Sequence, residues 1–196
     1  GPISFGIVVV PGGAIIDTGG WAAKPFRLAI SSWRHIDDNS MPPRIKSAAN
    51  YQNARLALLQ AEADGYDGVL MLDSGGHVTE EARGCVFMVR DGKTATPPVT
   101  SDILESITRE TLIQLLRESH DVMVQEREID RTELYVADEV FLCGTGLEVT
   151  PVGAVDRFDV GDGGPGPLTT AVRETYVAMA TGKSGLHSEW LTAVYD

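Results

Sequence analysis

The sequence of 196 residues has few cysteines, few basic residues and no long apolar run. Cys85 and Cys143 are the two cysteines, and their separation lacks metal-ligand spacing, so we expect reduced thiols in a cytoplasmic protein and no metal site. No run approaches the ~20 apolar residues of a membrane span, so no membrane role is expected. A net charge of −12 argues against nucleic acid as a partner, because phosphate backbones are bound by clustered Lys and Arg.

The beginning of the chain also lacks familiar signals. There is no initiating Met, basic leader or cleavage pattern, and the sequence opens almost directly into the strand-like run Ile7–Val10. We interpret the chain as a piece of a longer protein, long enough for one substantial core.

Short β-rich runs alternate with helical stretches, which favours a mixed α/β or α+β domain. Strands are predicted over Gly68–Asp73, Val78–Glu80 and Cys85–Arg90, and Asp91-Gly92 is a strong hairpin signal. We expect this region to form a β-meander. A further strand, Glu139–Cys143, leads into the turn Gly144-Thr145-Gly146.

A helix is predicted from Ile45 to Ala63, with Gly65 as its C-terminal cap and Lys46 in its first turn. On an ideal helix, Tyr51 is offset by about 140° from Lys46. If both side chains serve one ligand, the backbone over 47–50 should be irregular, or the helix should begin near Tyr51. Further helices are expected after Thr108 and over 168–180.

Several polar residues have chemistry that suits a cofactor site. Lys46 offers an amine, Tyr51 a phenol and Glu80 a carboxylate, while the helix start at Thr108 and the Gly144 turn offer N–H groups to a phosphate. Each also has a plainer reading: a solvated lysine, a boundary aromatic, a surface carboxylate and two caps. Spacing alone supports only an α/β domain with an anion site.

Ordered motifs carry a resemblance that goes further. The stretch from about Pro11 to Ala180 resembles the large domain of class IV, fold-type IV PLP (pyridoxal 5′-phosphate) aminotransferases, and is most similar to branched-chain amino acid aminotransferases. The matching segments occur in the family's order: Ser31-Ser32-Trp33, Lys46 with Asn50-Tyr51, Gly65-Tyr66-Asp67, Thr79-Glu80, Thr96-Pro97-Pro98, Ile107-Thr108-Arg109, Ala137–Phe141, Gly144-Thr145, Glu148–Val152 and Gly166–Thr169.

This resemblance implies an α+β (mixed α/β) fold of the D-amino acid aminotransferase-like type, with a mixed, barrel-like sheet flanked by helices. Residues 1–196 would form the PLP-binding large domain, and the family's small amino-terminal domain is absent from the sequence. That domain normally supplies an arginine for the cofactor phosphate and aromatic residues for the substrate.

The resemblance also implies residue roles. Lys46 would form the aldimine with PLP and then act as general base. Glu80 would bind the pyridine nitrogen and keep it protonated, and Tyr51 would bind the phenolic oxygen. Phosphate contacts would come from Ile107, Thr108, Gly144 and Thr145, and the substrate carboxylate would lie near Thr145 and Gly146.

Three positions depart from the family pattern. Glu81 stands where the family commonly has Gly after the glutamate, and Cys85 stands where it has Asn. Loss of that Asn is expected to loosen the cofactor site or to alter the tilt of the cofactor ring. Ile15 falls where branched-chain enzymes often place an aromatic residue near the substrate.

The implied reaction is transamination between leucine, isoleucine or valine and 2-oxoglutarate, as in branched-chain amino acid biosynthesis, by a homodimer or higher homo-oligomer. Alternatives within the superfamily are a D-amino acid or (R)-amine transaminase and an aminodeoxychorismate lyase. An alternative of another class is a non-catalytic PLP-binding fragment that lacks its small domain.

Overall fold

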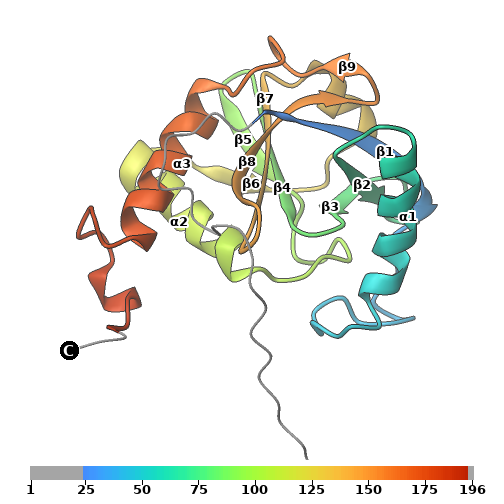
Figure 1. The fold of residues 1–196 in the computed structure, drawn as a ribbon, viewed down its shortest axis with the longest axis horizontal. Coiled ribbons are helices and arrows are strands. Elements are labelled where there is room, and N and C mark those ends of the chain that lie inside the picture. Colours follow the sequence, from blue (N-terminus) through green and yellow to red (C-terminus); the bar gives the residue numbers. More distant parts are fainter. Residues whose placement is uncertain (1–23, 194–196) are drawn as a thin grey trace, which may run out of the picture.

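The computed structural model describes residues 24–193 (Figure 1). The expected strand at Ile7–Val10 and the substrate-side Ile15 lie outside the described residues. The elements, in chain order, are β1 (Phe26–Arg34), α1 (Tyr51–Ala63), β2 (Gly68–Leu72), β3 (Val78–Glu81), β4 (Cys85–Arg90), β5 (Lys93–Thr96), α2 (Ile107–His120), β6 (Val124–Glu126), η1 (Arg131–Val136), β7 (Glu139–Gly144), β8 (Glu148–Val155), β9 (Phe158–Asp159), α3 (Pro167–Ala180) and η2 (Ser188–Trp190).

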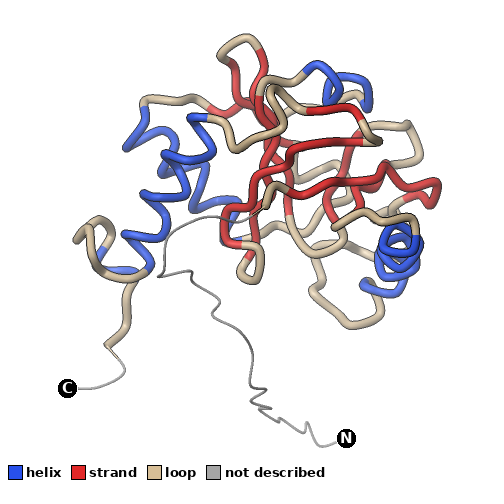
Figure 2. Tube along the Cα trace, turned by 45° about the horizontal axis from the view of Figure 1, so that its top comes forward, coloured by secondary structure: helices blue, strands red, loops and turns tan. Residues whose placement is uncertain are grey.

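The described strands form a nine-stranded mixed sheet in the order β3-β2-β1-β8-β7-β4-β5-β6, with β9 paired to β8. Strand β1 runs parallel to both β2 and β8, and β5 runs parallel to β6, whereas the other pairs are antiparallel. β3 is first in this order and β4 sixth, yet only residues 82–84 connect them. The sheet must therefore curl back on itself, which Figure 2 shows as a half-barrel.

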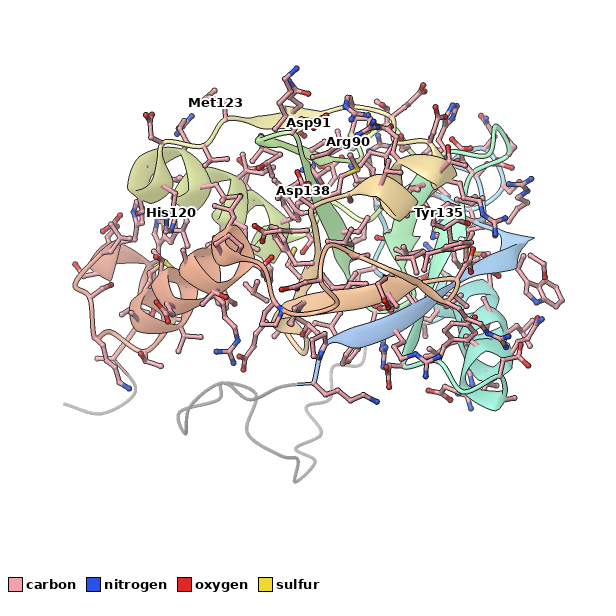
Figure 3. All side chains as sticks on the ribbon, turned by 90° about the horizontal axis from the view of Figure 1, so that it is seen from above. Arg90, Asp91, His120, Met123, Tyr135 and Asp138 are labelled. Atoms are coloured by element: carbon pink, nitrogen blue, oxygen red, sulfur yellow. The ribbon has the colours of Figure 1, made fainter. Side chains whose placement is uncertain are left out.

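The predicted strands and the Asp91-Gly92 hairpin are confirmed, but the predicted meander is wrong in part. β2 pairs with β3, and β4 pairs with β5, so the region forms two hairpins in separate parts of the sheet. Asp91 and Gly92 both have positive φ, as a type I′ turn requires. The Asp91 N–H also donates to Asp138 Oδ2 at 2.7 Å, and Figure 3 shows the two residues at the same end of the sheet.

Alternation along the strands separates two hydrophobic clusters. Val86 and Met88 of β4 face the inside of the curl, whereas Cys85, Phe87 and Val89 face outward, beneath α2 and α3. Figure 1 shows these two helices on one side of the sheet and α1 on the opposite side. Burying a large apolar side chain stabilises the fold by about 1.5–3 kcal/mol, so the central strands are the most firmly held part of the molecule.

Helix α1 packs on the sheet mainly through small residues, with the partly buried Leu58 beside them. Its buried positions are Ala54, Ala57 and Ala61, which lie against Val69 and Met71 of β2. Gly65 has a positive φ just beyond the helix, as predicted for its C-terminal end. No helix within residues 24–193 has the length and apolarity to span a bilayer.

Candidate active site

One cavity of about 170 Å³ opens between two walls of different construction. The loop wall, residues 35–51, joins β1 to α1, and the sheet wall comprises residues 80–85 and 144–146. The lining residues are His35, Pro43, Ile45, Lys46, Asn50, Tyr51, Ala54, Glu80, Glu81, Ala82, Arg83, Gly84, Cys85, Leu104, Ser106, Gly144, Thr145 and Gly146.

The helix that was predicted from Ile45 begins at Tyr51, so the placement of Lys46 in a first helical turn is wrong. The preceding backbone is irregular because the Asn50 side chain donates to two loop carbonyls, those of Pro42 at 2.9 Å and Ile45 at 2.8 Å. This loop lets Lys46 and Tyr51 line the same cavity, which a regular helix would prevent. The conditional prediction made from their angular offset is confirmed.

Glu80 is not a surface carboxylate, because β3 turns its side chain into the cavity. Its side chain is 17% exposed, and both of its oxygens have partners. Oε1 lies 3.3 Å from Nε2 of His35, and Oε2 accepts the backbone N–H of Leu104 at 3.2 Å. Burial disfavours the charged imidazole, but the Glu80 hydrogen bond and charge outweigh burial, so the pKa of His35 is raised.

Glu81, which stands where the resemblance led us to expect Gly, is almost fully buried. Its Oε2 accepts the Arg83 N–H at 2.7 Å, and its Oε1 lies 3.0 Å from Arg83 Nη2. Burial raises the pKa of Glu81, and the Arg83 guanidinium opposes that rise only in part. The buried Glu81 carboxylate is thus held at the cavity by Arg83, whose side chain reaches solvent.

The turn Gly144-Thr145-Gly146 closes the far side of the cavity. Here Gly84 approaches the β7 backbone so closely that a Cβ would lie 2.3 Å from the Cys143 carbonyl oxygen, which explains the glycine. A Cβ on Gly146 would meet open space. The turn therefore leaves backbone groups accessible to an anion.

The structure does not place Ile107 and Thr108 on this cavity. Ile107 is 86% exposed and borders a neighbouring cavity of about 220 Å³ at the start of α2, whereas Thr108 is buried and lines neither. Ser106 lines both cavities, and its Oγ accepts the Arg109 N–H as the N-terminal cap of α2. Arg109 is 2% exposed, and its Nε has no hydrogen-bond partner.

Sequence reasoning missed Ser106, His35 and Leu104. Ser106 carries a readable signal, since a serine directly before a helical run favours a cap. No local pattern marks the other two residues, because long-range folding alone brings them to Glu80. Among residues 24–193, no group of three or more His, Cys, Asp or Glu side chains could hold a metal ion.

The chain belongs to the amino-transferase class IV family, whose model matches residues 17–155. It is 45% identical to a probable branched-chain-amino-acid aminotransferase of Aquifex aeolicus over 94% of this chain and 58% of that protein. It is 38% identical to the Escherichia coli K12 branched-chain-amino-acid aminotransferase, covering 84% and 53%. The chain thus spans somewhat more than half the length of these relatives.

Solved structures agree with these relatives. The fold matches the branched-chain amino acid aminotransferase of Thermobaculum terrenum in its PLP form with a TM-score of 0.86 and 46% identity, over 88% of this chain and 56% of that one. The branched-chain aminotransferase of the archaeon Thermoproteus uzoniensis, solved with norvaline, matches with a TM-score of 0.86 and 36% identity, over 95% and 60%. The predicted fold, a curled mixed sheet flanked by helices, is confirmed.

Proposed function

We propose that this chain is the PLP-binding large domain of a branched-chain amino acid aminotransferase. One observation carries the proposal: the amine of Lys46 and the phenol of Tyr51, from the loop wall, line one cavity with the carboxylate of Glu80, from the sheet wall. Family membership and the relative solved in its PLP form support the same reading.

The donor set fits PLP. Lys46 has the amine that condenses with an aldehyde, Glu80 can hold a protonated ring nitrogen, and Tyr51 can donate to a phenolate oxygen. The phosphate is proposed to contact Gly144 and Thr145 on the sheet wall. Ile107 and Thr108 stay proposed as phosphate contacts through the start of α2, whose N-terminal N–H groups favour an anion.

Bound PLP supplies an electron sink for charge that develops on the substrate Cα. Lys46 would hold the cofactor covalently and, once the substrate amine has taken its place, its Nζ would accept the proton from the substrate Cα and return it to the cofactor. Glu80 keeps the proton on the ring nitrogen, and Thr145 and Gly146 orient the substrate carboxylate. Leucine, isoleucine or valine as donor and 2-oxoglutarate as acceptor follow from the relatives' names and the family resemblance, and are part of the proposal.

The substrate class is tested on the full-length protein with 2-oxoglutarate and three donors: L-leucine, D-alanine and (R)-1-phenylethylamine. We expect turnover with L-leucine, and its loss by at least about a hundredfold in Lys46→Ala, since Lys46 acts in proton transfer. Lys93→Ala, at an exposed position in β5, is the matched control. Turnover with D-alanine or the amine alone would identify one of the other superfamily activities.

We also propose a homodimer, as the family resemblance implies. Light scattering on the full-length protein tests this part. A strictly monomeric, active protein would contradict it. A protein that binds PLP at Lys46 yet turns over none of the three donors would be the non-catalytic domain considered above.

A further inference from the structure

His35 and Glu80 both line the cavity and form a hydrogen-bonded pair whose protonation follows from the geometry. His35 is the first residue after β1, and its backbone N–H donates to the Leu72 carbonyl at 2.8 Å, which fixes it beside β2. Its imidazole is only 8% exposed and places Nε2 3.3 Å from Glu80 Oε1. The pair therefore joins the loop wall to the sheet wall.

The other ring nitrogen determines where the protons lie. His35 Nδ1 is 3.0 Å from the carbonyl oxygen of Ile36, and a carbonyl can only accept, so Nδ1 carries a proton. A neutral imidazole with its proton on Nδ1 would turn the Nε2 lone pair toward the Glu80 carboxylate. That contact is repulsive, so the geometry requires a second proton between Nε2 and Oε1. The proton lies on the imidazole, because an imidazole is a stronger base than a carboxylate, and His35 is therefore an imidazolium.

Both Glu80 oxygens are consequently held by donors. The His35 imidazolium binds Oε1, and the backbone N–H of Leu104 binds Oε2. Besides Glu80, the charged group that acts on His35 is Asp102, in the segment before α2. Lys46 and Arg83 line the same cavity.

We propose that His35 is a positioning residue that, as an imidazolium, holds the Glu80 carboxylate in the orientation needed to bind the cofactor's ring nitrogen. This inference rests on the proposed function for the identity of the cofactor. The pairing itself concerns only residues of this chain. His35 is not itself in contact with a reacting atom.

The pairing has a pH dependence whose sign follows from the His35 pKa. That pKa is raised in the fold, so the contribution of the pair is complete below the ordinary histidine value near 6.5. It is lost as pH rises through the raised folded value. Above that pH, the neutral His35 no longer holds Oε1, and Glu80 loses its fixed orientation.

The pairing is tested first without a cofactor, by NMR titration of the imidazole resonances of the chain. Nitrogen-15 shifts should show both His35 nitrogens protonated, and the His35 pKa should fall in Glu80→Gln, because the hydrogen bond and the charge that raise it are removed. His77 does not line the cavity and pairs with Asp73 at 3.2 Å. Its pKa should be the same in Glu80→Gln as in the wild type. A His35 pKa that does not move in Glu80→Gln would overturn the proposal.

The positioning role is tested next on the PLP-loaded full-length protein. His35→Leu should lower kcat by about ten- to a hundredfold with little change in KM, the loss expected for a charge-assisted hydrogen bond. His35→Gln keeps a hydrogen-bond donor, so it should retain most of the wild-type kcat. We expect the absorption spectrum of the wild-type cofactor to change above pH 6.5 as His35 loses its proton, and this change should be absent in His35→Gln, which cannot titrate. His77→Gln, the matched control, should change neither.

The outcomes separate the two proposals. A wild-type spectrum and kcat that persist in both His35 variants would overturn the positioning role. Failure of wild-type protein to attach PLP at Lys46 would overturn the proposed function, and the ring-nitrogen assignment with it, whatever the titrations show about the pair.

Discussion

The two walls of the cavity are held in different ways. The sheet wall belongs to paired strands that pack against two buried hydrophobic clusters. In one of these clusters the rings of Phe87 and Phe141 stack beside Cys85, with their centroids 5.0 Å apart. The loop wall has no strand or helix between His35 and Tyr51, and its shape is fixed by backbone hydrogen bonds in turns and by a few side-chain hydrogen bonds. Segments with few buried apolar contacts open at low free-energy cost.

Under the proposed function the two walls have different tasks: the sheet wall recognises the cofactor, and the loop wall attaches it covalently. Glu80 and the Gly144 turn, which would bind the ring nitrogen and phosphate, belong to the rigid wall, whereas Lys46, the proposed covalent residue, belongs to the wall that can adjust. Under the proposed function Lys46 has to leave the cofactor and return in every cycle, and a loop permits that movement more readily than a strand. The predictions below disturb one wall at a time.

The largest effect is expected from breaking the sheet wall's core with Phe141→Ala. Phe141 is fully buried, so its loss should reduce the free energy of unfolding by about 3–5 kcal/mol. Urea denaturation measures this value. Leu59→Ala, on the exposed face of α1, should cost less than about 1 kcal/mol. Equal losses in the two variants would contradict the proposed ranking of the walls.

The loop wall should break without global unfolding in Asn50→Ala. Removing the amide leaves the Pro42 and Ile45 carbonyls without their donor, at a cost of about 1–3 kcal/mol. Hydrogen exchange should accelerate over residues 36–50 and stay unchanged over β4. Asn39→Ala, an exposed position in the same loop, is the control. Acceleration in β4 would show that the walls are coupled.

A smaller effect on the same wall is expected from Arg44→Ala. Arg44 binds Asp38 at 2.8 Å, Glu105 at 2.7 Å and the Val99 carbonyl at 3.0 Å, which ties the loop to the segment before α2. These ion pairs are exposed, so the loss should be no more than about 1 kcal/mol and should shrink at high salt. Hydrogen exchange over 36–50 at low and high salt measures it, with Arg55→Ala on α1 as control. A loss of stability in Arg44→Ala that is equal at low and high salt would show that the Arg44 side chain acts through packing and not through its charge.

The smallest effect is a pH dependence in the sheet wall. Burial raises the pKa of Glu81, so its contribution to stability is complete below the unfolded value near 4.5 and is lost as pH rises through the folded value. Glu81→Gln, which cannot titrate, should therefore remove this part of the pH dependence. Denaturation of both proteins between about pH 4 and pH 8 tests the sign. A wild-type stability that rises relative to the variant over this range would contradict it.

Local signals in the sequence predicted β2, β3, β4, β7 and the three α-helices, whereas no strand was predicted over β1 or β8. Asp91-Gly92 predicted its hairpin because a type I′ turn needs residues that tolerate positive φ. The start of α1 was misplaced because apolar spacing continues back to Ile45, whereas the Asn50 side chain binds the carbonyls of Pro42 and Ile45 and so holds the preceding residues in a loop. The separation of β3 from β4 depends on sheet order, which short-range patterns do not encode.

For the site, the sequence supplied the residue types, and the fold supplied their arrangement. Lys46, Tyr51, Glu80 and the Gly144 turn were predicted from motifs, and the structure brings them to one cavity. Ile107 and Thr108 are not on it. His35 could not be predicted, because its partner Glu80 is distant in the sequence and only the pairing of β1 with β2 and of β2 with β3 brings them together.

The central claim is that Lys46 is the covalent attachment point of a PLP site. Borohydride reduction after incubation with PLP, followed by peptide mapping of modified lysines, tests it without assuming a substrate. We expect one adduct per chain, confined to Lys46. Labelling spread over Lys24, Lys93 and Lys183, or no labelling of the full-length protein, would contradict the claim.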